Sequence, residues 1–317
     1  MKYLYYPGCS LEGSAREYDI SVRAVMAALG SELVELDDWT CCGASAADTS
    51  SYLLSLALPA RNLALAERSQ TRADVLVPCS ACYLNLVRAD DHMRRNAGTA
   101  GLVNQALETE GLSYAGGIRV RHLLDVLAND IGAEKIAAAS RSHLAAGDGP
   151  HIAAASRSHR GSAVGKLVGM KVAPYYGCQA LRPYRVFDDP ERPASMDALI
   201  RATGADVLDW SMGARCCGAG LMTTKKHLAL ELVADIFEAA KGADCIVTIC
   251  PMCQMNLDIG QKKISAKRGE SPAISILYLP QLIGLGLGLP ESGLRLDLNL
   301  AVTRSFARSL PRGGQTA

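Results

Sequence analysis

The chain has 317 residues and a formal net charge of +1, and 49% of its residues are hydrophobic. This length suits two domains with a substantial core, and the balanced charge argues against nucleic acid as a partner, which usually requires a basic excess. Residues 1–10 lack the apolar core of a signal peptide. We therefore expect a reducing, cytoplasmic setting, where the eleven cysteines are metal ligands or redox groups rather than structural disulfides.

The first half of the chain alternates strand and helix patterns. The segment 14–29 has apolar residues at helical spacing and is closed by Gly30, and a second helix is expected at 60–72, after Pro59. Strands are predicted at 3–7, 32–36 and 74–78, and a third helix from about Cys82. Such alternation implies an α/β fold with parallel sheets and helices on both faces.

Residues 135–166 separate the two halves. The octapeptide IAAASRSH occurs there twice, at 136–143 and 152–159. We predict an interdomain linker lengthened by a short duplication. Three of the six histidines lie in this segment, so a metal-binding histidine cluster is the alternative; they are His143, His151 and His159.

The second half repeats the pattern, with strands predicted at 170–176, 206–210 and 245–249 and a helix at 225–241. The apolar segment 273–290 is interrupted by Pro280 and by glycines, so we predict a buried or interfacial segment rather than a membrane span. Residues 291–317 are expected to form a tail. Within it, 295–312 fits either a packed helix with a frayed end or an amphipathic, membrane-facing surface. The predicted domains are therefore 1–134 and 167–290.

Ten of the eleven cysteines form two copies of one pattern. Each copy has a single cysteine, then Cys-Cys-Gly, then Cys-x-x-Cys, and Asn85 and Asn256 each follow the last cysteine by three residues. So many shared spacings indicate an internal duplication. The remaining Cys245 aligns with Val75 and is predicted to be a buried strand residue. The two copies are Cys9, Cys41, Cys42, Cys79 and Cys82, and Cys178, Cys216, Cys217, Cys250 and Cys253.

These cysteines stand at or just after predicted strand ends, and in a parallel sheet such positions meet at one edge. Five thiols per half exceed the four ligands of a structural zinc or an ordinary cubane cluster. Two adjacent cysteines fit two irons of one larger cluster more easily than two corners of one tetrahedron. We therefore favour an unusual multi-iron cluster in each half. Structural zinc, a thioredoxin-type dithiol and a strained Cys–Cys disulfide are the alternatives.

The doubled pattern resembles the pair of cysteine-rich CCG domains in the B subunit of heterodisulfide reductase, over roughly residues 2–290 apart from the linker at 136–165. The resemblance implies two pseudo-twofold-related CCG domains, each with a small parallel sheet flanked by helices. It also implies that each set of five cysteines binds a noncubane [4Fe–4S] cluster. A small disulfide would be held between the two clusters and cleaved reductively, and no catalytic residue beyond the ligands is assigned.

The resemblance also implies partners. The sequence has neither the cysteine run of cubane clusters nor the glycine fingerprint of a flavin site. Electrons would come from a protein like the C subunit of the same reductase, with cubane [4Fe–4S] clusters, and from a flavoprotein like its A subunit. The alternative within the same family is the E-type subunit of succinate dehydrogenase or fumarate reductase, which relays electrons to or from quinone with peripheral membrane contact.

Overall fold

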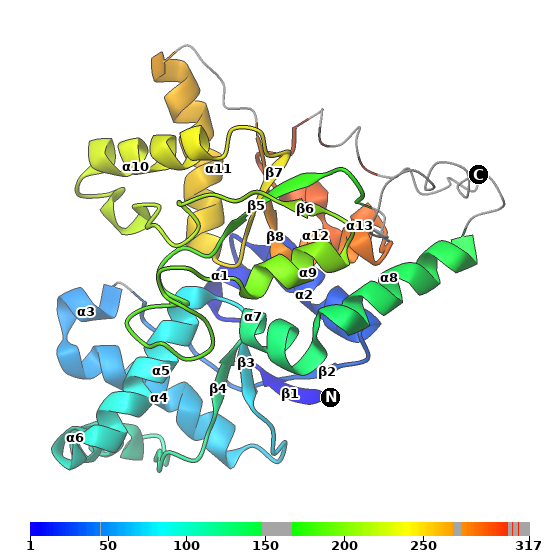
Figure 1. Cartoon of the computed structure of the whole chain (residues 1–317). Helices are drawn as coiled ribbons and strands as arrows, with labels where there is room; N and C mark the ends of the chain where they lie inside the picture. Colours follow the sequence, from blue (N-terminus) through cyan, green and yellow to red (C-terminus); the bar gives the residue numbers. More distant parts are fainter. Residues whose placement is uncertain (45, 148–166, 269–273, 304–305, 307–309, 311–317) are drawn as a thin grey trace.

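Two parallel sheets of identical strand order form the framework of the protein. The computed structural model describes residues 1–44, 46–147, 167–268, 274–303, 306 and 310. Its sheets have the orders β2-β1-β3-β4 and β6-β5-β7-β8. Figure 1 shows the first sheet in the lower part of the view, coloured blue to green, and the second sheet in the upper part, coloured green to orange. The predicted α/β fold with two related domains is confirmed.

The N-terminal half has a short core strand, β3, whose three residues are all buried. It pairs in parallel with β1 and β4, and β1 pairs with the edge strand β2. The strands are β1 (Lys2–Tyr5), β2 (Glu32–Glu35), β3 (Val75–Val77) and β4 (Val120–His122). The helices are α1 (Cys9–Glu12), α2 (Arg16–Ala28), α3 (Ala46–Ser50), α4 (Tyr52–Arg68), α5 (Ser80–Arg95), α6 (Ala97–Glu108), α7 (Leu123–Asp125), the π-helix η1 (Val126–Ile131) and α8 (Ala133–Gly147).

The helix expected at 60–72 is longer at its start than predicted. It begins at Tyr52, after Ser51, whose hydroxyl accepts a hydrogen bond from the Leu54 amide. Pro59 lies inside the helix rather than before it. Proline has no N–H for the carbonyl four residues earlier, and here the Arg88 guanidinium donates to that Ser55 carbonyl instead, at 3.3 Å.

The C-terminal half repeats this layout with β7 at its centre, paired to β5 and β8. The fourth strand of each sheet, β4 or β8, was not predicted. The strands are β5 (Lys171–Tyr175), β6 (Asp206–Val207), β7 (Cys245–Thr248) and β8 (Ser275–Tyr278). The helices are α9 (Ser195–Ala202), η2 (Ala219–Leu221), α10 (Lys226–Ala239), α11 (Pro251–Arg268), α12 (Leu279–Gly286), α13 (Glu291–Leu294) and η3 (Leu296–Leu298).

The apolar segment predicted to be buried is buried. Strand β8 and helix α12 occupy 275–286, and every residue in them is buried. In the described part of the chain, no helix combines the length and hydrophobicity needed to cross a bilayer.

Equivalent helices join the two halves. Helix α2, which follows β1, packs on α12 and α13, while α9, which follows β5, packs on η1 and α8. The Tyr18 ring of α2 stacks on Tyr278 with centroids 4.1 Å apart. At the matching position on the other side, Phe187 stacks on His122 at 6.0 Å. The two sheets are therefore held by one continuous packed junction.

Part of the predicted linker is helical. Helix α8 contains the first octapeptide copy and buries Ile136 and Ser140. The second copy, at 152–159, lies outside the described residues, as do His151 and His159. The domain boundaries at 134 and 167 therefore stay predictions.

The predicted tail begins with ordered structure. Within 291–298, α13 and η3 bury Leu294 and Leu296. Phe306 and Leu310 are buried as well, and 311–317 lie outside the described residues. The membrane-facing alternative for 295–312 stays a prediction.

Candidate functional site: two five-cysteine centres

The first centre collects five thiols that follow the carboxyl ends of β1, β2 and β3. The Sγ atoms of Cys9 and Cys41 are 3.5 Å apart, and those of Cys42 and Cys82 are 3.4 Å apart. Cys41 is also hydrogen-bonded to Cys42, and Cys79 to Cys82. The five sulfurs thus form one continuous chain of contacts.

The second centre lies at the ends of β5, β6 and β7, where its five thiols form a hydrogen-bonded pair and a hydrogen-bonded group of three. The Sγ atoms of Cys217 and Cys253 are 3.5 Å apart. Cys178 is hydrogen-bonded to Cys216, and Cys250 to Cys253. The structure therefore brings together all ten of the sequence-predicted site residues, five in each half.

The eleventh cysteine stands apart. Cys245 begins β7 and is fully buried, as expected for a small strand residue. Burial raises the pKa of its thiol, so it is the protonated form that packs in the sheet.

Each centre is open on one side and closed on the other. Cys9 and Cys41 are exposed, as is Cys216, and Cys178 is partly buried. The second cysteine of each Cys-Cys-Gly motif and both Cys-x-x-Cys cysteines are buried in each half. A group held by these thiols would therefore meet solvent, a substrate or a partner on its open side only.

A tyrosine supports the Cys-Cys-Gly turn in each half. The Tyr6 hydroxyl donates to the Thr40 carbonyl at 2.8 Å, directly before Cys41. The Tyr175 hydroxyl does the same at the Arg215 carbonyl, directly before Cys216, at 2.7 Å. Both tyrosines have pKa values raised by burial and then by the nearby cysteines, so their O–H groups stay protonated and act as donors.

The two asparagines noted in the repeat hold the same turns from the other side. Asn85 Nδ2 donates to the Cys42 carbonyl at 3.2 Å, and Asn256 Nδ2 donates to the Cys217 carbonyl at 2.7 Å. Since each side chain comes from the helix that carries the end of Cys-x-x-Cys, it ties the two cysteine motifs of its half together.

The glycine before the first cysteine leaves room for a sulfur. Gly8 has φ +73°, and a Cβ there would lie 2.7 Å from Cys82 Sγ. Gly177 has φ +67°, and its Cβ would lie 3.0 Å from Cys253 Sγ. Both the left-handed backbone and the close approach require glycine at these positions.

The thiols share their protons unevenly, and the second cysteine of the Cys-Cys-Gly motif and the last cysteine of Cys-x-x-Cys behave alike in the two halves. The pKa of Cys42 is lowered by its hydrogen bonds with Cys41 and Cys82, and that of Cys217 by its bond with Cys253. The pKa values of Cys82 and Cys253 are raised by the same bonds. The second cysteine of each Cys-Cys-Gly motif therefore favours the thiolate, which is the form that binds metal, and in the C-terminal half Cys216 and Cys250 do so as well.

The donor set suits a soft, multi-iron group. In the part of the chain that the structure describes, no three Cys, His, Asp or Glu side chains are arranged to hold a single metal ion. Each half instead offers five thiols, each of them hydrogen-bonded to at least one other thiol of the set. Thiolates are the usual ligands of iron–sulfur clusters.

The comparisons with known proteins agree with this geometry. A model of the cysteine-rich domain family, CCG, matches residues 3–87 and 172–258. These two matches cover the same parts of each half as the two centres. The chain belongs to the CCG family and carries two copies of its domain.

Named relatives match nearly the whole chain. The 8-methylmenaquinol:fumarate reductase membrane anchor subunit of Wolinella succinogenes is 34% identical over 94% of this chain and 96% of its own. A protein of Archaeoglobus profundus, named as similar to the B subunit of heterodisulfide reductase, is 30% identical over 92% of each chain. The B subunit of a CoB-CoM heterodisulfide reductase of Methanosarcina acetivorans is 28% identical over 94% of this chain and 93% of its own. The Wolinella succinogenes and Methanosarcina acetivorans relatives are subunits of multi-subunit reductase complexes.

A solved structure, a hypothetical protein from Helicobacter pylori, superposes with a TM-score of 0.69 at 15% identity. It covers 95% of this chain, which spans 52% of that chain. This likeness concerns the fold.

Sequence reasoning missed several supporting residues. Tyr6 and Tyr175 each stand two residues before the Gly-Cys of their copy, so aligning the repeats could have identified them, although strand packing explained them equally well. Tyr18 and Ser80 both contact the Ile249 carbonyl of the other half. The second copy has Phe187 and Pro251 at the matching positions, so comparing the two copies could not have identified them.

Proposed function

We propose that this chain is the catalytic subunit of a heterodisulfide reductase-like complex that cleaves, or in reverse forms, a disulfide between two noncubane [4Fe–4S] clusters. The observation that carries the proposal is the presence of two sets of five neighbouring thiols, one in each of two related domains. One cluster would use Cys9, Cys41, Cys42, Cys79 and Cys82. The other would use Cys178, Cys216, Cys217, Cys250 and Cys253.

Such clusters, when bound, supply one-electron transfer and sites for sulfur. The chain's own residues hold the ligands in place and leave one side open. Buried Cys42, Cys82, Cys217 and Cys253 form the closed side, while exposed Cys9 lies at the open side. The overall change is disulfide plus two electrons plus two protons giving two thiols, so two one-electron centres match its electron count.

The electrons would come from partners. By analogy with the family, these are a protein like the C subunit of the reductase, with cubane [4Fe–4S] clusters, and a flavoprotein like its A subunit. That the named relatives are subunits of larger reductases supports this assignment. We infer a cytoplasmic location, with membrane association through partners.

A second candidate is favoured by one relative. The Wolinella succinogenes protein is named as a membrane anchor subunit of a methylmenaquinol:fumarate reductase. On that analogy, this chain would be an E-type subunit that relays electrons to or from quinone at the membrane. The same two centres would then pass electrons onward without breaking a sulfur–sulfur bond.

The deciding experiment is metal and sulfide analysis of anaerobically purified protein, followed by EPR after thiol and oxidant treatment. We expect about eight irons per chain, about four for each cluster. One or two zincs without sulfide would overturn the cluster assignment. Reduced protein mixed with a dialkyl disulfide and, separately, with a soluble menaquinone analogue then separates the two candidates, since the first predicts reoxidation by the disulfide.

A further inference from the structure

The two Cys-x-x-Cys loops meet at a single buried hydroxyl. Tyr18 is fully buried on α2, and its O–H lies 3.1 Å from the Pro78 carbonyl and 3.1 Å from the Ile249 carbonyl. These carbonyls directly precede Cys79 and Cys250. The Tyr18 hydroxyl of the N-terminal half therefore contacts the Cys-x-x-Cys loop of its own half and the matching loop of the C-terminal half.

Stacking and burial hold this hydroxyl in position. The Tyr18 and Tyr278 rings are parallel to within 1° with centroids 4.1 Å apart, and both side chains are buried. Burial, and then the charges of Cys79 and Cys250, raise the pKa of Tyr18. The hydroxyl thus keeps its proton and can donate to either carbonyl.

A second hydroxyl crosses the junction beside it. Ser80 Oγ is 3.2 Å from the Ile249 carbonyl and 3.2 Å from His122 Nε2, and all three groups are buried. The Ser80 hydroxyl also bonds to the thiol of Cys250. Ser80 thus lies in the N-terminal half but contacts a cysteine of the C-terminal centre.

The tautomer of His122 sets the direction of these bonds. His122 Nδ1 accepts from the Leu124 amide at 3.1 Å, and burial lowers the His122 pKa to about 3, so the ring is neutral. The single ring proton must then be on Nε2, where Ser80 Oγ and the Pro78 carbonyl can accept it. The Ser80 proton is left to point across the junction, toward Ile249 and Cys250.

The second copy has no equivalent of this crossing. The residue after Cys250 is Pro251, where the first copy has Ser80, and proline offers no donor. At the other stacked pair, Phe187 takes the place of Tyr18 and has no hydroxyl. Among the described contacts of the two Cys-x-x-Cys loops, the hydrogen bonds across the junction therefore run from the N-terminal half to the C-terminal half.

We propose that Tyr18 and Ser80 are positioning residues that fix the two Cys-x-x-Cys loops against each other, so that the two centres act as one unit, and that Ser80 tunes the C-terminal centre from the opposite half. The first part rests on the described contacts alone. The second part rests on the proposed function, since it concerns a cluster held by Cys250.

The first test is hydrogen exchange of the purified chain, comparing Tyr18→Phe with Tyr278→Phe. Both changes keep the stacked rings, but only the first removes the bonds to the loop carbonyls; the Tyr278 hydroxyl contacts Gln254 instead, at 3.4 Å. We expect amides in peptides 78–85 and 249–256 to exchange about fivefold faster in Tyr18→Phe, in both loops together. Unchanged exchange, or a change in one loop only, would contradict the proposal that Tyr18 fixes the two loops against each other.

The second test uses the loaded protein. Hydrogen bonds to cluster sulfurs raise the reduction potential, so Ser80→Ala should move the potential of the C-terminal centre to a more negative value and leave the N-terminal centre nearly unchanged. Ser55→Ala, a buried serine bonded within α4 at Tyr52, is the control. An equal shift of both centres, or a shift of the N-terminal centre alone, would overturn the cross-domain effect.

A third measurement separates positioning from general stability. Tyr18→Phe should change the magnetic interaction between the two reduced centres while the melting temperature stays close to that of Tyr278→Phe. An unchanged interaction despite faster loop exchange would show that Tyr18 does not set the separation. If the unmodified chain binds no iron, the proposed function fails. The hydrogen-exchange test still decides whether Tyr18 fixes the two loops against each other.

Discussion

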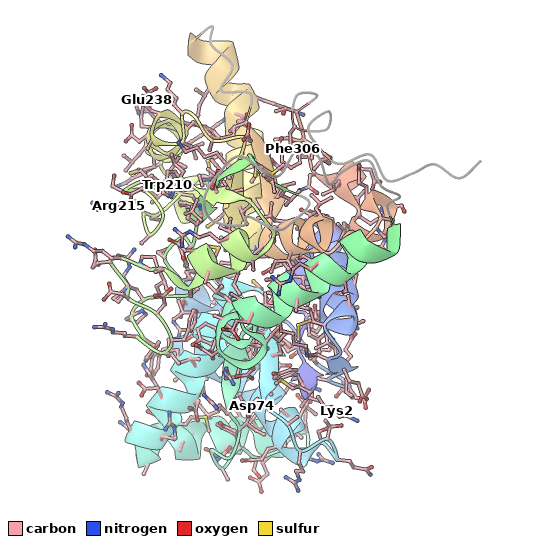
Figure 2. All side chains as sticks on the ribbon, turned by 45° about the vertical axis from the view of Figure 1, so that its right-hand side comes forward. Lys2, Asp74, Trp210, Arg215, Glu238 and Phe306 are labelled. Carbon is pink, nitrogen blue, oxygen red and sulfur yellow. The ribbon has the colours of Figure 1, made fainter. Side chains whose placement is uncertain are left out.

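The two centres carry the same thiols in different electrostatic surroundings. Beside Cys9 and Cys41 the surface opens into a cavity of about 570 Å³ whose charged lining is acidic. Near Cys216, a cavity of about 1070 Å³ is lined by Trp210 and Arg215 (Figure 2) and mixes arginines with carboxylates. Arg182 also helps lower the Cys216 pKa. The acidic residues of the first cavity are Glu12, Glu35, Asp37 and Asp38.

The two copies of the domain therefore share their ten cysteines but differ in the charged residues around them. Negative charges near a redox centre disfavour its reduced form and positive charges favour it. We therefore expect the C-terminal centre to have the higher reduction potential. The same asymmetry is present inside the molecule, where Ser80 donates across the junction and Pro251 cannot.

The largest expected effect is the loss of one centre. Cys42→Ser and Cys217→Ser each remove a buried cysteine whose pKa is lowered by a neighbouring thiol. Each should lower iron from about eight to about four per chain and reduce disulfide cleavage by more than about 100-fold. Iron analysis, EPR and a turnover assay check this, and each variant assigns one EPR signal to one half.

The eleventh cysteine supplies the control for these variants. Cys245→Ser changes a buried thiol in β7, so iron content and both EPR signals should persist. Activity that survives both Cys42→Ser and Cys217→Ser would show that the adjacent pair is not needed as ligands.

The glycines before the first cysteines give the next largest effect. Gly8→Ala places a Cβ 2.7 Å from Cys82 Sγ, while Gly132→Ala, at a similar φ of +79°, meets nothing within 4 Å. Both changes carry the backbone cost of a side chain at positive φ, about 1 kcal/mol. Only Gly8→Ala should also lower iron at the N-terminal centre.

The C-terminal half allows the same pair of variants. Gly177→Ala, with its Cβ 3.0 Å from Cys253 Sγ, should impair loading less than Gly8→Ala, and Gly169→Ala is its unobstructed control. Equal iron content in all four variants would contradict a steric role for Gly8 and Gly177.

Most of the differences between the two halves could not be predicted from the sequence, whereas the cysteine sets and the strands that the halves share could be. The cysteine spacing located all ten thiols, and alternating patterns located β1, β3 and β7, because these depend on local order along the chain. The long start of α4 was missed because Pro59 looked like a boundary. Only the folded chain brings Arg88 to the carbonyl that proline leaves unpaired.

Contacts across the junction could not be predicted for the same reason. Tyr18 and Ile249 are 231 residues apart in sequence, and the repeat does not indicate that they meet. Tyr6 and Tyr175 could be predicted in part. The repeat indicates their positions, but it does not indicate which carbonyls accept their hydrogen bonds.

A buried carboxylic acid distinguishes the C-terminal half further. Asp258 is buried on α11, and it matches Val87 when Asn256 is aligned with Asn85. Its carboxyl group accepts hydrogen bonds from Gln254 Nε2 at 2.5 Å and from the Leu300 amide at 3.3 Å. Burial raises the Asp258 pKa to about 7 against the lowering effect of these two hydrogen bonds.

This pKa predicts how stability depends on pH. Between its ordinary value near 3.8 and about 7, Asp258 keeps its proton in the folded chain but loses it in the unfolded chain. The folded state then binds more protons, so its contribution to the free energy of unfolding falls as pH rises from about 4 to about 7 and is constant above that. The full change is up to about 4 kcal/mol at 1.36 kcal/mol per pKa unit.

Asp258→Asn removes this titration while keeping an oxygen for the Gln254 and Leu300 donors. Denaturant unfolding from pH 4 to pH 8 should therefore show a smaller loss of stability with rising pH in the variant than in the unmodified chain. Parallel curves for the two proteins would contradict a raised Asp258 pKa.

The smallest expected effect tests the arginine side of the comparison. The pKa of Cys216 is lowered first by its hydrogen bond with Cys178, then by the Gly218 amide, and also by the Arg182 charge. Arg182→Gln removes that charge but retains a donor for the Ala214 carbonyl, which Arg182 contacts. Since Arg182 is partly exposed, with 36% of its side chain accessible, solvent screens its charge.

We therefore expect Arg182→Gln to lower the potential of the C-terminal centre by less than about 60 mV, the equivalent of a tenfold change in a one-electron equilibrium. The N-terminal centre should not move. Arg185→Gln is the matched control, because it removes a charge from the same loop that is paired with Asp189 at 3.1 Å. Potentiometric EPR titration of both variants measures the reduction potential of each centre. Equal shifts in Arg182→Gln and Arg185→Gln would mean that the Arg182 charge beside Cys216 does not cause the difference in potential between the two centres.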